Sequence, residues 1–207
     1  MVESTRVPSE QEQFWAGEFG SEYTVRNAIL PEQRTKFFKN ILNHAPGIQS
    51  VCELGANKGH NLLAIQSVDA NVQLTGLELN PSALKELQSH PGLEGFQGAI
   101  QSFNPNRTFD LVYTCGVLIH LNPDDLTAVY QKMLALSNRY VMINEYYNPS
   151  PVELSYRGHD GKLFKRDFGG EFWDANAGQV KLVDYGFLWQ RVEPSWDNTT
   201  WWLFEKV

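Results

Sequence analysis

The nine residues 51–59, VCELGANKG, are the most informative stretch of this sequence. They predict a short strand that ends at Leu54, a tight turn and then a helix. Gly55 lets the chain turn, and Gly59 lets the first helical turn approach the sheet or a ligand closely. Asn57 stands where many such loops carry glycine, and asparagine tolerates a left-handed backbone better than most residues.

An acidic residue follows Gly59 after nineteen positions. Glu78 ends the next expected strand, residues 72–79. A carboxylate there can accept both hydrogen bonds of a ribose diol. Because neighbouring parallel strands end at one edge of an open sheet, the glycine turn and Glu78 together predict a nucleoside-binding site. The alternative is a structural turn beside a solvated glutamate.

Strands and helices alternate along the middle of the chain. The expected strands are 50–54, 72–79, 93–99, 109–115 and 140–144, and the expected helices are 58–67, 81–90 and 122–136. Such alternation predicts an α/β fold whose mostly parallel sheet carries helices on both faces. Only about ten residues separate the third and fourth strands, which leaves room for a short or degenerate helix alone.

The two ends of the chain depart from this alternation. An aromatic-rich segment and a helix after Pro31 precede the first strand, and residues 148–170 form an insert with little periodicity. Two final strands, 180–188 and 201–206, predict an antiparallel hairpin at the sheet edge, which makes seven strands. The expected organisation is one domain with a helical cover (1–47), a cofactor-binding core (48–147) and an acceptor-side insert with the terminal hairpin (148–207).

Composition excludes several classes of protein. The 207 residues carry 17 Lys and Arg against 24 Asp and Glu, a net charge of −7, which argues against general nucleic-acid binding. Two cysteines are too few for a disulfide scaffold or a cysteine-based zinc site, and no metal is expected. The N-terminus has no signal-peptide pattern and no apolar run approaches eighteen residues, so the expectation is a cytoplasmic protein without membrane contact.

Two motifs resemble those of class I S-adenosylmethionine-dependent methyltransferases. The pattern Glu-x-Gly-x-Asn-x-Gly at 53–59 resembles their motif I, and FDLVYTCGVLIHL at 109–121 resembles their motif IV and the turn after it. The resemblance covers about residues 51–147 and implies a Rossmann-like fold with S-adenosylmethionine as cofactor. A nicotinamide-dependent reductase is disfavoured, since the complete Gly-x-Gly-x-x-Gly triplet and a Tyr-x-x-x-Lys pair are both missing.

The resemblance implies a role for each matching residue. Glu53, Gly55, Asn57 and Gly59 would form the turn near the methionine part of the cofactor. Glu78 would hold the ribose hydroxyls, and the adenine would be faced by Leu79, Ile100 and Gln101. The floor beneath the sulfonium would be lined by Cys115, Gly116 and His120. Such enzymes often bind the adenine amino group with an acidic residue after the third strand. Here that run is GAIQS at 98–102, without a carboxylate, so Gln101 or Ser102 would have to substitute.

Further segments resemble the methylases associated with pseudaminic acid biosynthesis. They are 14–15, 20–23, 26–27, 37–38, 144–149, 156–159 and 165–168. The family name records gene context, so it supports methyl transfer better than a sugar acceptor. In this family Tyr23 and Arg26 would reach over the cofactor, and Arg26 would pair with its carboxylate. A surface ion pair of Arg26 is an equally good interpretation.

Three residues at strand ends are the candidates for catalysis: His120, Glu145 and Tyr147. A base is needed only if the acceptor atom carries a proton that must leave. His120 titrates near neutrality and can accept that proton, or it packs under the cofactor as a structural histidine. Glu145 is a base or binds a cationic acceptor, unless it pairs with Arg157 or Arg166.

Six residues near the insert are the candidates for binding the acceptor: Tyr146, Tyr156, Arg157, His159, Lys165 and Arg166. The basic residues among them suit an acidic or phosphorylated acceptor, and a solvated charged loop explains them equally well. The predicted function is methyl transfer to oxygen or nitrogen of a small molecule, a sugar or a peptide-derived metabolite. The alternatives are a non-catalytic S-adenosylmethionine-binding regulatory subunit and, less favoured, the reductase.

Overall fold

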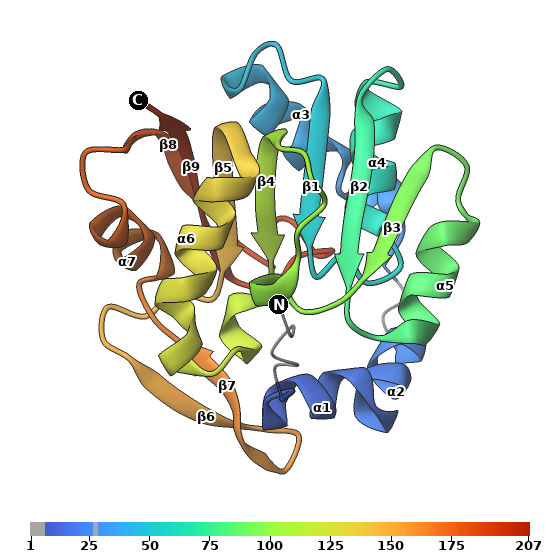
Figure 1. Cartoon of the computed structure of the whole chain (residues 1–207), viewed down its shortest axis with the longest axis vertical. Helices are drawn as coiled ribbons and strands as arrows, with labels where there is room; N and C mark the ends of the chain where they lie inside the picture. Colours follow the sequence, from blue (N-terminus) through green and yellow to red (C-terminus); the bar gives the residue numbers. More distant parts are fainter. Residues whose placement is uncertain (1–6, 27–28) are drawn as a thin grey trace, which may run out of the picture.

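The structure is a computed structural model that describes residues 7–26 and 29–207 (Figure 1). Residues 1–6, part of the N-terminal stretch on which the signal-peptide prediction rests, lie outside the described residues, as does Asn27 of the N-terminal resemblance. Within the described ranges, no helix is long and apolar enough to cross a membrane.

A seven-stranded sheet forms the centre of the molecule, in the order β3-β2-β1-β4-β5-β9-β8. Its strands are β1 (Ser50–Leu54), β2 (Gln73–Glu78), β3 (Leu93–Gln97), β4 (Phe109–Cys115), β5 (Ser137–Glu145), β8 (Val180–Leu188) and β9 (Thr199–Lys206). The first five are parallel, and β9 runs antiparallel to both β5 and β8. The mostly parallel seven-stranded sheet with a terminal hairpin is therefore confirmed.

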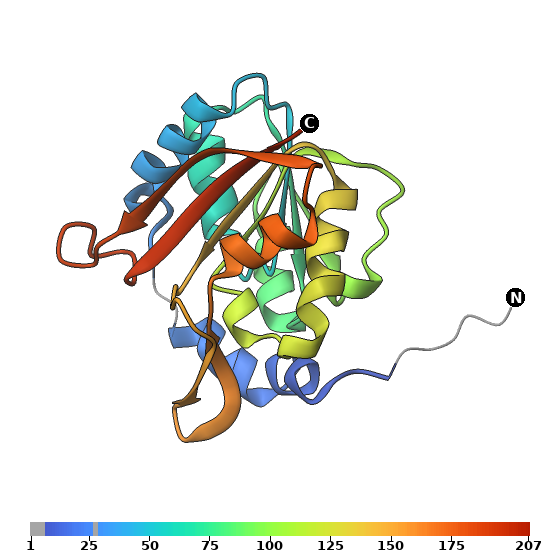
Figure 2. The same cartoon turned by 90° about the vertical axis from the view of Figure 1, so that its left-hand side faces the viewer.

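Helices cover both faces of this sheet (Figures 1 and 2). The helices are α1 (Glu10–Ala16), α2 (Glu18–Arg26), α3 (Thr35–His44), α4 (His60–Val68), α5 (Pro81–Ser89), α6 (Leu126–Leu136) and α7 (Phe168–Ala175). Successive strand residues point to opposite faces, so in β1 Val51 packs with the core under α3 and α4, whereas Cys52 packs with the core under α6 and α7. The tight join between β3 and β4 holds a single 3₁₀ turn, Ile100–Ser102, as the spacing predicted.

The insert after β5 is more regular than its sequence indicates. Instead of an irregular segment it forms a separate antiparallel ribbon, β6 (Val152–Tyr156) and β7 (His159–Lys165), followed by α7. Arg157 and Gly158 make its two-residue turn, both with positive φ (50° and 84°). Such turns usually carry Asn-Gly or Asp-Gly, so the sequence Arg157-Gly158 does not predict a hairpin.

The carboxyl ends of the parallel strands all face α1, α2 and the β6–β7 ribbon (Figure 1). The N-terminal helices are fixed there by Asn80, whose side-chain amide donates to the Trp15 carbonyl at 3.2 Å and the Ser21 hydroxyl at 3.1 Å. Gly20 permits this close packing, because a Cβ at that position would lie 1.8 Å from the Trp15 carbonyl oxygen. Helices α1 and α2 thus lie over the strand ends, where ligands bind in open α/β sheets, whereas α3 packs on one face of the sheet.

Candidate active site

The turn after β1 has the backbone that its glycines and Asn57 predict. Gly55, Asn57 and Gly59 all have positive φ, at 80°, 48° and 82°. Space is also restricted at the two glycines. A Cβ on Gly55 would lie 2.6 Å from Val117 Cγ2, and one on Gly59 would lie 2.8 Å from Leu93 Cδ2. The turn is therefore held close to β3 and to the segment after β4, and larger side chains do not fit.

Glu78 connects the ends of β1 and β2. Its Oε2 accepts a hydrogen bond from the Asn57 backbone N–H and its Oε1 one from the Asn80 N–H, both at 2.7 Å. Burial raises the pKa of Glu78, and these backbone donors oppose that shift. A carboxylate has about four acceptor positions, so each oxygen can accept a further bond from a ligand hydroxyl.

Glu53 lies at the base of the cleft in a chain of polar contacts. Its Oε1 accepts from the Asn61 side-chain amide at 2.6 Å, and Asn61 Oδ1 accepts from Arg34 Nη1 at 2.8 Å. The other oxygen, Oε2, is buried beside the Tyr113 hydroxyl and makes no hydrogen bond of normal geometry. Burial raises the pKa of Glu53 to about 8. A cationic ligand group beside the Glu53 carboxyl group would favour its ionised form and lower this pKa.

Arg34, like Arg157, lines the wide part of the cleft. It lies just before α3, is half-buried, donates to the Ser195 carbonyl at 3.2 Å and stacks 4.0 Å from the centre of the Trp196 ring. Its Nε is buried without a hydrogen-bond partner. Arg26, by contrast, lines no described cavity and pairs with Glu22 at 3.0 Å on the surface of α2. Of its two interpretations, the surface ion pair is the one observed.

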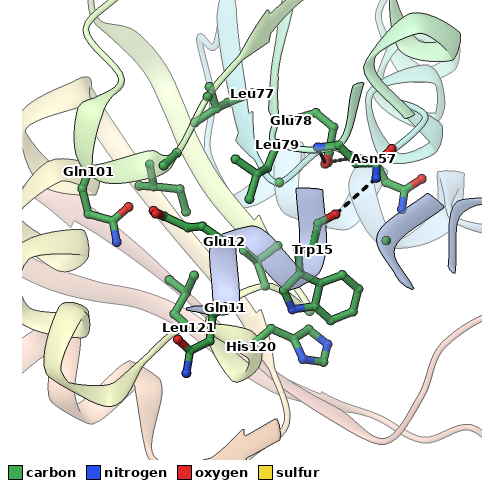
Figure 3. A pocket seen from close by; sticks show the side chains of 18 of the residues that line it. Gln11, Glu12, Trp15, Asn57, Leu77, Glu78, Leu79, Gln101, His120 and Leu121 are labelled. Atoms are coloured by element: carbon green, nitrogen blue, oxygen red, sulfur yellow. Dashed lines mark hydrogen bonds between the residues drawn. The ribbon is translucent and has the colours of Figure 1, made fainter. Parts of the chain in front are cut away.

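Two adjoining cavities make up the cleft. The narrow cavity has a volume of about 130 Å³ and lies under α1 (Figure 3). The wide cavity has a volume of about 410 Å³ and extends toward the β6–β7 ribbon and the β8–β9 loop. Both are lined by Gly55, Asn57, Gly116, Val117 and His120, which mark where they meet.

The structure distributes the expected cofactor residues between these cavities. Those lining only the narrow cavity are Glu78, Leu79, Ile100 and Gln101. Those lining only the wide cavity are Tyr23, Glu53 and Cys115. Burial raises the pKa of the Cys115 thiol to about 11, and its sulfur accepts from the Asn144 amide at 3.3 Å. Gly59 lines neither cavity and acts through the backbone of the turn.

His120 lies at the junction of the two cavities. Burial lowers its pKa to about 4, so the imidazole is neutral at physiological pH. Nδ1 lies 2.7 Å from the Lys162 carbonyl, which can only accept, so Nδ1 carries the proton and Nε2 is left as an acceptor. The ring packs against Trp15 (4.4 Å between centroids) and Tyr156 (5.1 Å).

Glu145 and Tyr147 do not reach either cavity. Glu145 is fully buried and accepts from the backbone N–H groups of Val117 (2.9 Å) and Leu118 (3.0 Å) at the start of the turn Leu118–His120. It therefore caps the segment that carries His120, rather than pairing with an arginine, and burial raises its pKa to about 7. Tyr147 is 44% exposed and packs against Trp202, outside the cleft.

Three of the six proposed acceptor residues line the wide cavity: Tyr146, Tyr156 and Arg157. The others contact side chains elsewhere. His159 packs against Phe14, with 5.0 Å between ring centroids. Lys165 Nζ lies 4.9 Å from the centre of the Tyr146 ring, and Arg166 pairs with Glu171 at 2.7 Å. Tyr146 donates its hydroxyl proton to Asp197 in the β8–β9 loop, which the sequence did not single out.

Sequence reasoning also missed the residues that α1 supplies. Gln11, Glu12 and Trp15 line the narrow cavity (Figure 3). The aromatic residues of this segment predicted packing, but nothing in its spacing indicates a cofactor contact. The sequence does not indicate a role for Arg34 either, because a single arginine among the polar residues before a helix matches no functional pattern.

Comparison with known proteins adds to this geometry. Residues 51–138 match the model of a methyltransferase domain family, and no curated protein matches the chain. Among solved structures, the chain is similar to magnesium protoporphyrin IX methyltransferase from Synechocystis PCC 6803 with bound S-adenosylhomocysteine. The TM-score is 0.71 at 13% identity, over 95% of this chain and 98% of that one. The chain has the methyltransferase fold.

Two further methyltransferases match over most of their length. The amino pentose methyltransferase CalS10 from Micromonospora echinaspora, with bound S-adenosylmethionine, has a TM-score of 0.66 at 14% identity, over 91% of this chain and 97% of that one. The 1,6-didemethyltoxoflavin-N1-methyltransferase from Burkholderia thailandensis has a TM-score of 0.71 at 12% identity, over 99% and 93%. These matches show that the chain shares its fold with these methyltransferases.

Proposed function

We propose that this protein transfers a methyl group from S-adenosylmethionine to an oxygen or nitrogen of a small-molecule acceptor. The observation that carries the proposal is the pair of cavities that meet at Gly116 and His120. The narrow cavity ends on the Glu78 carboxylate and suits the adenosine part of the cofactor. The wide cavity has room for the amino-acid part and for an acceptor.

The polar groups of the wide cavity fit a zwitterionic amino acid. Glu53 lines this cavity, and its carboxyl group matches an ammonium group. Arg34 lines it as well and offers a guanidinium to a carboxylate. We assign to Arg34 the role that the sequence gave to Arg26. Tyr23 lines the same cavity, which supports a place for it over the cofactor.

The acceptor would lie between aromatic side chains. Tyr146, Tyr156 and Trp196 line the wide cavity, and Asp197 and Arg157 add one charge of each sign. Aromatic faces beside a few polar groups suit a polar ring, which supports a sugar or a peptide-derived metabolite. The resemblance to pseudaminic acid-associated methylases agrees with a sugar but does not require one. In this proposal residues 1–47 cover the site, 48–147 bind the cofactor and 148–207 supply the acceptor side.

The protein's part in the reaction is alignment and exclusion of water. The bound sulfonium supplies an already activated methyl group, so the nucleophile must be held in line with the methyl carbon and sulfur. Trp15 and Tyr156 pack on His120 and close the junction on two sides. If the acceptor atom carries a proton, His120 Nε2 is the acceptor placed to take it, while Glu145 holds the His120 turn in position.

Calorimetric titration tests the proposal. Wild-type protein, Glu78→Ala and Glu94→Gln would each be titrated with S-adenosylmethionine, S-adenosylhomocysteine and NADH. The first two ligands are expected to bind wild type and Glu94→Gln equally, since Glu94 lies on β3 away from both cavities. Glu78→Ala is expected to bind them roughly tenfold to hundredfold more weakly, because a charged acceptor is lost.

Each alternative function has its own result in this experiment. Binding of NADH alone would favour the reductase and contradict the proposal. Binding of S-adenosylmethionine without methyl transfer to any amino sugar, sugar or peptide in a screen with labelled methyl groups would favour the regulatory subunit.

A further inference from the structure

The turn of the β6–β7 ribbon has an unfavourable backbone conformation at Arg157. Its φ is 50°, in the left-handed region that residues with a Cβ rarely adopt. In the described part of the chain, the other non-glycine residues with positive φ are Asn57 and Asn106, and asparagine tolerates this region. An arginine therefore weakens this turn. Backbone outliers of this kind cluster at ligand-binding sites, so the surroundings of the Arg157 side chain matter.

The Arg157 side chain belongs to the wide cavity. It lines that cavity, and its guanidinium carbon lies 5.9 Å from the centre of the Tyr156 ring. The Tyr156 ring in turn packs against His120, with 5.1 Å between centroids. Tyr156 is therefore a shared neighbour of the guanidinium and of the residue at the junction of the two cavities.

Arg157 is a cation without a carboxylate partner. Among the described residues it forms no ion pair. The two carboxyl groups that line the same cavity have other partners, since Glu53 accepts from Asn61 and Asp197 accepts from Tyr146. The donors of the Arg157 guanidinium are thus left to solvent or to a ligand, and their planar fork matches a carboxylate or a phosphate.

We propose that the acceptor carries an anionic group, a carboxylate or a phosphate, and that Arg157 binds this group while the body of the acceptor lies against Tyr156. The inference rests on the proposed function, because it places the acceptor in the wide cavity. It narrows the acceptor from a polar small molecule to an acidic one. If Arg157 is instead only a solvated turn residue, its replacement changes the stability of the ribbon and no binding preference.

Two replacements of Arg157 separate binding from the conformation of the turn. Arg157→Asn creates Asn-Gly, the preferred sequence for such a turn, so the melting temperature should stay or rise while the charge is lost. Arg157→Lys keeps the charge but not the planar fork. Arg191→Gln is the matched control, because Arg191 is an exposed arginine of the β8–β9 loop that lines neither cavity.

The experiment measures ligand binding by saturation-transfer NMR to protein saturated with S-adenosylhomocysteine. The probes are D-glucose, D-glucuronate and D-glucose 6-phosphate, which share one ring and differ only at carbon six. At least one anion is expected to bind wild type and Arg191→Gln roughly tenfold more tightly than glucose. Arg157→Asn should lose this preference and Arg157→Lys should keep part of it. The anion that binds more tightly identifies the group as carboxylate or phosphate.

The outcomes separate this inference from the function beneath it. The inference is overturned if wild type prefers neither anion, whether all three compounds bind equally or none binds, and also if the preference survives in Arg157→Asn. The affinity for S-adenosylhomocysteine should be the same in all variants, since Arg157 does not line the narrow cavity. Failure of wild type to bind S-adenosylhomocysteine would overturn the proposed function itself.

Discussion

The two cavities of the cleft are built from different parts of the chain. The narrow cavity depends on main chain at the ends of parallel strands, where Glu78 is held by two backbone N–H groups and the turn 55–59 cannot accommodate larger residues. The wide cavity depends on side chains from three distant segments, with Arg34 before α3, Tyr156 on the ribbon and Asp197 in the β8–β9 loop. Because main chain defines the cofactor site, substitutions can alter the side chains of the acceptor site without disturbing cofactor binding.

The largest effect is expected where backbone defines the site. In Gly55→Ala the new Cβ would overlap Val117, a stiff β-branched side chain, at a φ of 80°. The shifted turn should lower kcat/KM by roughly 100-fold. Gly178→Ala is the matched control, because its φ of 75° carries the same strain but no atom lies within 4 Å of the added Cβ. That variant should lose about 1–2 kcal/mol of stability and keep its activity. Equal activity losses in both would refute the close-contact argument.

The next effect separates two arginines. Arg34→Ala should weaken S-adenosylmethionine binding roughly tenfold to hundredfold, because the carboxylate loses a charge-assisted hydrogen bond. Arg26→Ala should bind within twofold of wild type, since Arg26 pairs with Glu22 at the surface. Titration with 5′-methylthioadenosine, which lacks the amino-acid part, sharpens the result. Its affinity should be unchanged in both variants, and a large loss in Arg34→Ala would indicate a general structural defect.

The buried carboxylate of Glu53 should make cofactor binding depend on pH. Its pKa in the free protein is raised from 4.5 to about 8, so below pH 8 it is protonated and must lose that proton to pair with an ammonium. Affinity should fall by roughly tenfold per pH unit from 8 to 6, with about one proton released per molecule bound. Calorimetry in buffers of different ionisation enthalpy measures that proton. Glu53→Gln should remove both effects, and proton release that persists in this variant would contradict the assignment.

The same raised pKa has a consequence for the stability of the unliganded protein. Between pH 4.5 and 8 the native state holds a proton on Glu53 that the unfolded chain has lost, so the free energy of unfolding falls as pH rises through this range. Denaturant titrations of wild type and Glu53→Gln at pH 5 and 8 give the difference. Glu53→Gln should lose less stability than wild type over this interval.

The smallest effect separates two neighbouring tyrosines on the acceptor side. Tyr146→Phe removes the hydroxyl that donates to Asp197 in the wide cavity and should raise the acceptor KM by about two- to tenfold. Tyr147→Phe should leave KM and kcat within twofold, because Tyr147 packs against Trp202 outside the cleft. A larger loss in Tyr147→Phe than in Tyr146→Phe would reverse the placement of the acceptor.

The sequence predicted the narrow cavity better than the wide one for a physical reason. Strand ends, glycines with positive φ and an acidic residue one strand later are local features, so the turn 55–59, Asn57 and Glu78 could all be placed from spacing. Arg34, Glu12 and Asp197 reach the cleft through tertiary packing, which spacing does not encode. Glu145 ends a strand as expected, but its carboxylate turns inward to cap a 3₁₀ segment, because the unpaired N–H groups there require an acceptor.

A crystal structure with bound S-adenosylhomocysteine tests the central claim most directly. The purine is expected in the narrow cavity between α1 and the segment 98–102, and the ribose hydroxyls on Glu78. The sulfur is expected beside Gly116 and His120, and the carboxylate on Arg34. A nucleoside bound outside the narrow cavity, or a ligand whose amino-acid part avoids both Arg34 and Glu53, would contradict that claim.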